Sequence, residues 1–218
     1  MVYNPDFVDK FSLEGDVRNE TILKGPLYLR DPATYMATST PWIVNGEHVT
    51  LTPEIELLDM ETLDVGNDLK GRSQGYRSIK FYMDLRTTKA QSRNQSNDVP
   101  IFRYADVLMM KAEAILRGAS ATRGDTPQSL MNQIRAYVQA PLISGEPTLE
   151  DLLDERAREF VDESWRRNDL IRFGKFEDDW GFKHVVNPSA KTQTFRRIFP
   201  IPNYVLNTNT NWTQNNGY

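Results

Sequence analysis

The pattern of hydrophobic and polar positions changes character near residue 98. Before that point, short apolar stretches are separated by Gly-Pro, Asp-Pro and Thr-Pro dipeptides, and no long helical period is present. Residues 49–51 and 78–85 carry β-branched and aromatic side chains between these breakers, which predicts short strands. Residues 87–98 are rich in Ser, Asn and Gln, which is typical of an exposed loop.

From Val99 onward the pattern predicts helices. Apolar residues recur at steps of three and four over residues 101–116. Pro100 stands where a first helical turn tolerates proline, and Gly118 stands where glycine ends a helix. A second helix is predicted to begin at residues 125–127, where a capping oxygen precedes a proline. The two helices and the Gly-containing turn between them form a helical hairpin.

A third helix is predicted to begin at Thr148, because Asp151 three residues later completes a capping pair. Its apolar positions continue to Phe173, so we expect it to end at Gly174. The Phe-Pro-Ile-Pro run at residues 199–202 then predicts extended backbone. The predicted fold class is therefore mainly α, with helical hairpins beside an irregular, loop-rich lobe that contains short strands.

Composition narrows the function classes. The chain has 218 residues, 39% of them apolar and 26% charged, which suits a folded protein. A net charge of −4 without a basic stripe argues against nucleic acid as a partner. The absence of cysteine excludes disulfides, thiolate catalysis and cysteine-ligated zinc. No window approaches the ~18–20 apolar residues of a spanning helix, and residues 1–5 lack the pattern of a signal peptide.

Three stretches, in their order and spacing, carry a family resemblance. They are DVPIFRYADVLMMKAEA at residues 98–114, LDERAREF at 153–160 running into RRNDLIRFGK at 166–175, and FPIP at 199–202 with NWTQNNGY at 211–218. Together they resemble the C-terminal region of the SusD/RagB family. The resemblance covers residues 98–218 well and the preceding residues only loosely.

The resemblance implies a non-enzymatic protein of the bacterial cell surface. Family members are anchored by lipid to the outer face of the outer membrane, bind oligosaccharides or sometimes peptides, and cover a SusC-like TonB-dependent transporter. Their fold combines tetratricopeptide-like helix pairs with a less regular, ligand-binding lobe. By this resemblance residues 1–98 are the ligand-binding lobe and residues 99–218 the helical region with an extended tail. The family's N-terminal section, with its lipid-attachment cysteine, is missing here, so we expect the chain to be a fragment or an incomplete gene product.

Aromatic and amide side chains of the lobe are the candidate ligand contacts, because flat rings stack on sugars and amides bond hydroxyls. Trp42 and Tyr35, with Asn45 nearby, lie on a proline-punctuated segment, and irregular surface segments commonly bear binding sites. Family members also place such aromatics upstream of the helix near Val99. A core position for Trp42 stays open. A second cluster includes Tyr76 and Arg72, with Tyr82 and Asn67, but alternation over residues 76–85 favours packing there.

Catalysis has weaker support in the sequence. Glu155 and Glu159 could act as paired carboxylates, but they lie one helical turn apart among arginines, which favours an ion-paired helix face. His48 and His184 have no ligand or triad pattern around them, and no motif predicts a metal or other cofactor. The alternatives to a glycan-binding protein are a helical protein-interaction scaffold and, with least support, a glycosidase-like enzyme.

Overall fold

The computed structural model describes residues 2–81 and 97–218. It divides into two compact units, Met1–Arg166 and Arg167–Tyr218, and each is described by itself. The sequence predicts a boundary after residue 98, between a ligand-binding lobe and a helical region. The first compact unit contains residues from both sides of that boundary, because it includes both the strands and the longest helices. The division at residue 98 therefore stays a prediction about function.

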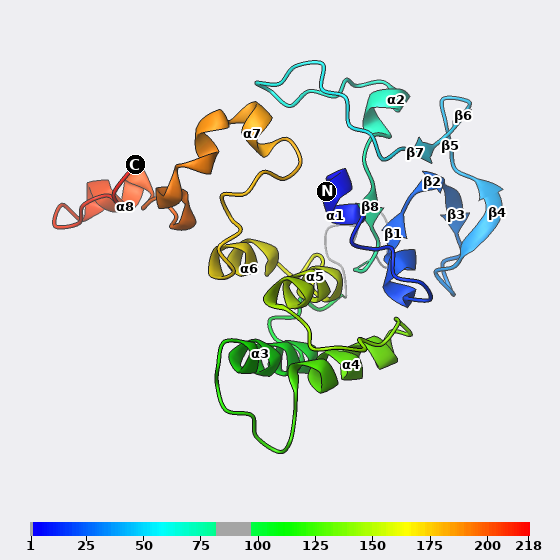
Figure 1. The fold of residues 1–218 in the computed structure, drawn as a ribbon. Helices are drawn as coiled ribbons and strands as arrows, with labels where there is room; N and C mark the ends of the chain where they lie inside the picture. The colour runs from blue at the N-terminus through cyan, green and yellow to red at the C-terminus, as the bar shows by residue number, and fades with distance from the viewer. Residues whose placement is uncertain (1, 82–96) are drawn as a thin grey trace. The chain divides into compact units, whose positions relative to one another are not determined.

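The strands of the first unit pair as four short antiparallel ladders within the described residues (Figure 1). The registers place Ile22 opposite Ser78, Gly25 opposite Leu51, Tyr28 opposite Pro41 and Ile43 opposite His48. The strands are β1 Ile22–Leu23, β2 Gly25–Pro26, β3 Tyr28–Arg30, β4 Ala37–Pro41, β5 Ile43–Val44, β6 Glu47–His48, β7 Thr50–Leu51 and β8 Arg77–Ser78; the short helical turns beside them are α1 Pro5–Val8, η1 Val17–Thr21 and α2 Leu69–Arg72.

Two small hydrophobic clusters hold these strands. One joins Val8, Phe11 and Ile22 to Val161, and the other is formed by residues 27, 49 and 51. The expected strand at 49–51 is confirmed in part by β7. The strand expected at 78–85 is shorter than predicted in its described part, because only Arg77–Ser78 is extended and residues 80–81 form a turn.

Three amphipathic helices complete the first unit, and they confirm the prediction of a mainly helical fold with helical hairpins. The helices are α3 Tyr104–Leu116, α4 Pro127–Tyr137 and α5 Leu149–Glu159. The first two lie side by side (Figure 1) and bury Met109, Ala112, Leu130 and Met131. The predicted caps are confirmed: Thr126 and Thr148 each accept a hydrogen bond from the backbone N–H three residues on.

Two predicted helix boundaries are wrong. The first helix begins at Tyr104 rather than at Pro100, because Arg103 is extended and its guanidinium binds the carboxylates of Glu159 and Glu163. The third helix ends at Glu159 instead of continuing to Phe173. Asp162 and Ser164 adopt left-handed backbone with φ of 64°, which breaks the helical path.

The second unit contains short helical elements connected by loops. They are α6 Arg166–Arg172, α7 Lys183–Val186, η3 Pro188–Lys191, η4 Thr194–Arg197 and α8 Asn203–Thr208. The first residue of α6 belongs to the first unit and the rest of that helix to the second. Gly174 follows α6 with φ of 71°, as its predicted terminating role requires. Residues 199–202 contain neither helix nor strand, in agreement with the expected extended run. None of the described helices has the length and apolar character needed to span a membrane.

Candidate functional site

Trp42 is held by its backbone while its side chain meets solvent. Its N–H donates to the carbonyl oxygen of Leu27 at 2.9 Å, and its own carbonyl accepts from the N–H of Val49 at 2.9 Å. Leu27 and Val49 are both buried in the cluster beneath. The Trp42 side chain is 44% exposed. A ring fixed at its base and open at its face is suited to stacking against a flat ligand.

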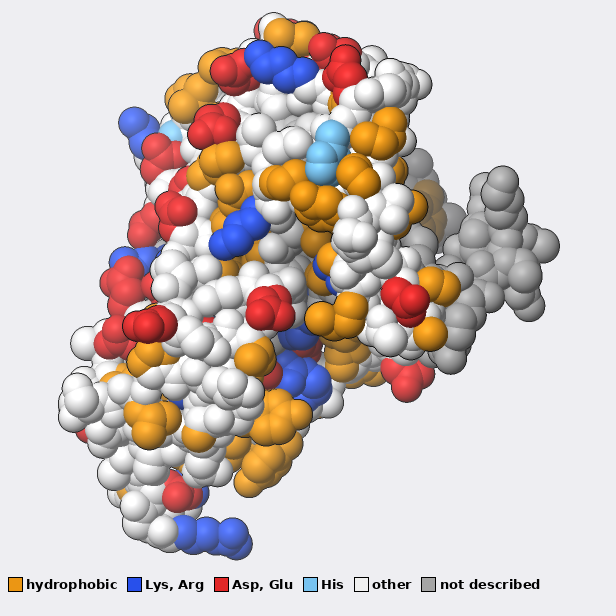
Figure 2. All heavy atoms as spheres, turned by 90° about the vertical axis from the view of Figure 1, so that its right-hand side faces the viewer, with side chains coloured by type: hydrophobic (Ala, Val, Ile, Leu, Met, Phe, Trp, Pro, Cys, Tyr) orange, Lys and Arg blue, Asp and Glu red, His pale blue; other side chains and the backbone are white. Residues whose placement is uncertain are grey.

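A second exposed aromatic residue, Tyr28, lies on the same ladder system. It stands opposite Pro41, the residue before Trp42, and its side chain is 39% exposed. Its ring meets the ring of His48 edge to face, with centroids 5.2 Å apart. The Nε2 of His48 lies 2.7 Å from the carbonyl oxygen of Leu27, so this nitrogen carries the proton. Ile43 is also exposed. We call the exposed side chain of Trp42 together with its backbone support the Trp42 face. Figure 2 shows hydrophobic side chains on the side of the first unit that bears β3 to β6.

Asn45 occupies the turn between β5 and β6. Asn45 and Gly46 have φ of 51° and 84°, which identifies the two-residue hairpin turn that Asn-Gly pairs favour. The Asn-Gly signal was present in the sequence and predicts this hairpin by itself. Asn45 is exposed and has a conformational role at the turn; its contact with a ligand stays a prediction.

Tyr35 lies at the other end of the β3–β4 ladder from Trp42. Tyr28 and Pro41 pair at one end, whereas Arg30 and Ala37 pair at the end that leads into the Tyr35 turn. The turn is rigid, because the Asp31 carboxylate accepts two backbone N–H bonds and Arg30 donates to the Tyr35 carbonyl at 2.6 Å. The structure therefore does not bring Tyr35 beside Trp42.

Tyr76 and Arg72 belong to a different part of the lobe. Tyr76 packs against both hydrophobic clusters, and its carbonyl accepts a hydrogen bond from the N–H of Tyr3 at 3.1 Å. This position agrees with the packing role that the sequence favoured. Arg72 is the last residue of α2, and its side chain is exposed. Asn67, which precedes the helix, is exposed as well. Tyr82 lies outside the described residues.

A groove next to the Trp42 face was not predicted. The even-numbered residues from 48 to 56 are polar, whereas Val49, Leu51 and Ile55 between them are buried or half-buried. In an extended chain alternate side chains share one face, so this period of two was a readable signal. The polar face and α2 enclose about 410 Å³. We call this space the β7–α2 groove; its lining residues are Glu47, His48, Thr50, Thr52, Glu54, Glu56, Leu69, Lys70, Ser73 and Gln74.

The two walls of the β7–α2 groove are tied together by main-chain hydrogen bonds. The N–H of Thr52 donates to the carbonyl of Ser73 at 3.2 Å, and the N–H of Gly75 donates to that of Glu54 at 3.3 Å. The Gln74 side chain accepts from the N–H of Glu56 at 2.6 Å. These bonds fasten residues 52–56 to residues 73–75, which follow α2.

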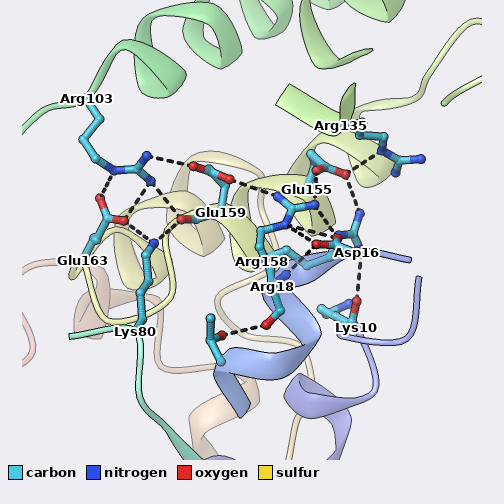
Figure 3. Close-up of polar contacts among 11 residues, drawn as sticks. Lys10, Asp16, Arg18, Lys80, Arg103, Arg135, Glu155, Arg158, Glu159 and Glu163 are labelled. Carbon is cyan, nitrogen blue, oxygen red and sulfur yellow. Dashed lines mark hydrogen bonds and ion pairs between the residues drawn. The ribbon is translucent and has the colours of Figure 1, made fainter. Parts of the chain in front are cut away.

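The carboxylates Glu155 and Glu159 lie in a buried ionic cluster (Figure 3). Glu155 is fully buried and its oxygens accept from Arg18 at 2.7 Å, Arg135 at 2.8 Å and Arg158 at 2.7 Å. Asp16 completes this cluster by pairing with Arg18 at 2.7 Å. Only Arg158 belongs to the same helix as Glu155. The expected ion pairing is therefore present, but it joins distant segments rather than forming one helix face.

Glu159 and Glu163 form the other half of the cluster. Arg103 donates to Glu159 and to Glu163, each at 2.8 Å. Lys80 pairs with Glu163 and also donates to the Glu159 carbonyl. Arg18 reaches Glu159 at 3.0 Å and so links the two halves. The cluster fastens the N-terminal segment, the residue before α3 and the loop after β8 to α5.

This environment is unsuited to acid–base chemistry at Glu155. Burial would raise the pKa of Glu155, but the charges of Arg18 and Arg158 outweigh burial and lower it from 4.5 to about 2. A glycosidase general acid needs a raised pKa instead. His48 and His184 belong to different units, and His184 lies with Nε2 2.9 Å from the Glu177 carbonyl oxygen. In the described ranges no group of three or more His, Asp or Glu side chains could hold a metal ion.

The fold is a helix-rich scaffold to which buried ion pairs fasten a small lobe of short strands. The lobe carries exposed aromatic rings and a polar groove. The sequence model of the SusD family matches residues 54–218, which is most of the chain. The chain belongs to the SusD family.

Two curated relatives and one solved structure are similar to it. The starch-binding protein SusD of Bacteroides thetaiotaomicron is 35% identical over 124 residues, which cover 56% of this chain and 22% of that protein. The SusD-like protein P38 of Formosa agariphila is 34% identical over 135 residues, covering 54% and 25%. The chain thus spans about a quarter of the length of these relatives. The crystal structure of a SusD superfamily protein from Parabacteroides distasonis has a TM-score of 0.53 and 20% identity, and it covers all of this chain and 42% of that one, which supports the fold.

Proposed function

We propose that this chain is part of a non-catalytic glycan-binding protein of the bacterial cell surface. Its family membership and its similarity to a protein named for starch binding support this proposal. The observation that carries it is the Trp42 face, where an exposed indole is anchored by two backbone hydrogen bonds over a buried cluster. We further propose that the whole protein is lipid-anchored at the outer membrane and passes its ligand to a SusC-like TonB-dependent transporter.

The Trp42 face supports stacking as the mode of binding. An exposed indole buries apolar area against the C–H face of a sugar without needing any proton transfer. Among the other candidates, Asn45 is at the hairpin tip next to the face, whereas Tyr35, Tyr76 and Arg72 lie elsewhere in the lobe. We therefore propose Trp42 and Tyr28 as the main stacking residues, with Asn45 as a hydroxyl contact.

Trp42→Ala tests this function. We expect retardation in affinity electrophoresis against a polysaccharide panel to fall about tenfold, because loss of one stacked ring costs on the order of 1–1.5 kcal/mol. The far-ultraviolet circular dichroism should not change, since the indole is exposed. Trp212→Ala is the matched control, because Trp212 is 53% exposed and lies in the second unit. Equal losses in both variants, or unfolding of the Trp42 variant, would contradict the proposal.

A second candidate function, a scaffold for a protein partner, is favoured by one face of α3. Tyr104, Val107 and Met110 follow one another at steps of three and are 73%, 51% and 44% exposed. Ile101 just before the helix is 73% exposed. Rows of exposed apolar side chains mark association surfaces. This surface would hold another polypeptide rather than a sugar.

The α3 surface predicts self-association of the isolated chain. We expect light scattering after size-exclusion chromatography to show oligomers at high protein concentration. The triple variant Tyr104→Gln, Val107→Gln and Met110→Gln should be monomeric, because glutamine favours helix and removes the apolar row. A wild-type chain that remains monomeric at all concentrations would contradict this prediction.

A further inference from the structure

The β7–α2 groove carries an excess of negative charge. Glu47, Glu54 and Glu56 line it with one cation, Lys70, so that these four side chains sum to a charge of −2. Lys70 lies 3.4 Å from Glu56, and both side chains are more than two-thirds exposed, so this pair is weak. Glu47 and Glu54 form no ion pair with any other residue that the structure describes. Two carboxylates of the groove are therefore available to a positively charged ligand.

The rim of the groove adds capacity for hydrogen bonds. Thr50 and Thr52 present hydroxyls on the exposed rim. A ligand with several hydroxyl or amino groups matches these partners, and the volume of about 410 Å³ is within the range of small-molecule sites.

The chemistry of the groove selects an organic cation. Its carboxylates are not grouped as metal ligands in the described part of the chain. A carboxylate binds an ammonium group by charge-assisted hydrogen bonds, which are stronger than bonds between neutral groups. The same carboxylates repel uronic acids and sulfated sugars. A hexose bearing an amino group combines the positive charge with the hydroxyls that the rim can bond.

The groove is continuous with the exposed Tyr28 ring through His48. The His48 ring lines the groove and also contacts the Tyr28 ring. We propose that the β7–α2 groove is a subsite for a protonated amino sugar, so that a glycan stacked on Tyr28 places a hexosamine unit against Glu47 and Glu54. This inference rests on the proposed glycan-binding function and adds to it the class of glycan.

Calorimetric titration with two matched oligosaccharides tests the subsite. The probes are a glucosamine hexamer and its N-acetylated counterpart, compared in the same buffer at about pH 6. We expect the wild-type chain to bind the amine form roughly fivefold more tightly, and high salt to remove the difference. The double variant Glu47→Gln and Glu54→Gln should bind both probes equally. Glu146→Gln makes the same change at an exposed residue outside the groove and should keep the preference.

Three results with the two hexamers would overturn the subsite. They are equal binding of the two hexamers by the wild-type chain, binding of neither, and loss of the preference in Glu146→Gln. Tighter binding of a lysine hexapeptide than of the glucosamine hexamer would also overturn it, because the groove would then be a peptide site. The glycan-binding proposal stands or fails separately, on whether any polysaccharide of the panel shows binding that depends on Trp42.

Discussion

We expect Glu155→Ala to lower the free energy of unfolding by about 3–5 kcal/mol, because removal of one partner leaves buried charges uncompensated. The carboxylate of Glu155 receives hydrogen bonds from Arg18, Arg135 and Arg158, and the side chain is fully buried. A loss of this size is a large part of the ~5–15 kcal/mol that stabilises a typical domain. Urea unfolding followed by circular dichroism measures it.

Two further variants define the cause of this loss. Glu155→Gln keeps the shape of the side chain but not its charge, so we expect a smaller but clear loss, and this variant remains measurable if the alanine variant does not fold. Glu146→Ala, at an exposed loop position, should change stability by less than about 0.5 kcal/mol. A Glu155→Ala protein within 1 kcal/mol of the wild type would show that the arginines find other partners or water.

The helices were the most predictable part of the fold. Thr126 and Thr148 act as N-caps, and the hydrogen bonds of an N-cap depend only on a few adjacent residues. The boundaries that failed depend on distant partners instead. Arg103 is held outside α3 by Glu159 and Glu163, some sixty positions later, and no local pattern contains that information.

The candidate site was predictable only in part. Trp42 was identified by its type and neighbourhood, and the structure shows it exposed. Its neighbour Tyr28 was missed, because the pairing of Tyr28 with Pro41 follows from the β3–β4 register. Tyr35 was grouped with Trp42 because the two are close in sequence, but the same ladder places them at opposite ends. The β7–α2 groove had a local signal in the period of two, but its other wall comes from α2.

The ionic cluster also predicts a loss of stability in acid. The folded-state pKa of Glu155 is lowered from 4.5 to about 2, because its arginine partners outweigh the effect of burial. A carboxyl group whose pKa is lowered by folding contributes stability that is complete above its unfolded pKa and is lost as the pH falls through its folded pKa. This difference corresponds to about 3 kcal/mol for Glu155. The contribution is therefore present at pH 5 and above and declines between about pH 4.5 and 2.

Urea midpoints measured from pH 7 to pH 3 test this window. We expect a plateau from pH 7 to about pH 5 and a fall below it, with an unchanged slope of the unfolding free energy against urea. In Glu155→Gln the fall should be shallower, because an amide does not titrate, while Glu146→Gln should follow the wild type. An equally steep acid loss in Glu155→Gln would assign the acid sensitivity to other carboxylates. Glu155 would then hold the lobe to α5 without setting the pH range in which the site exists.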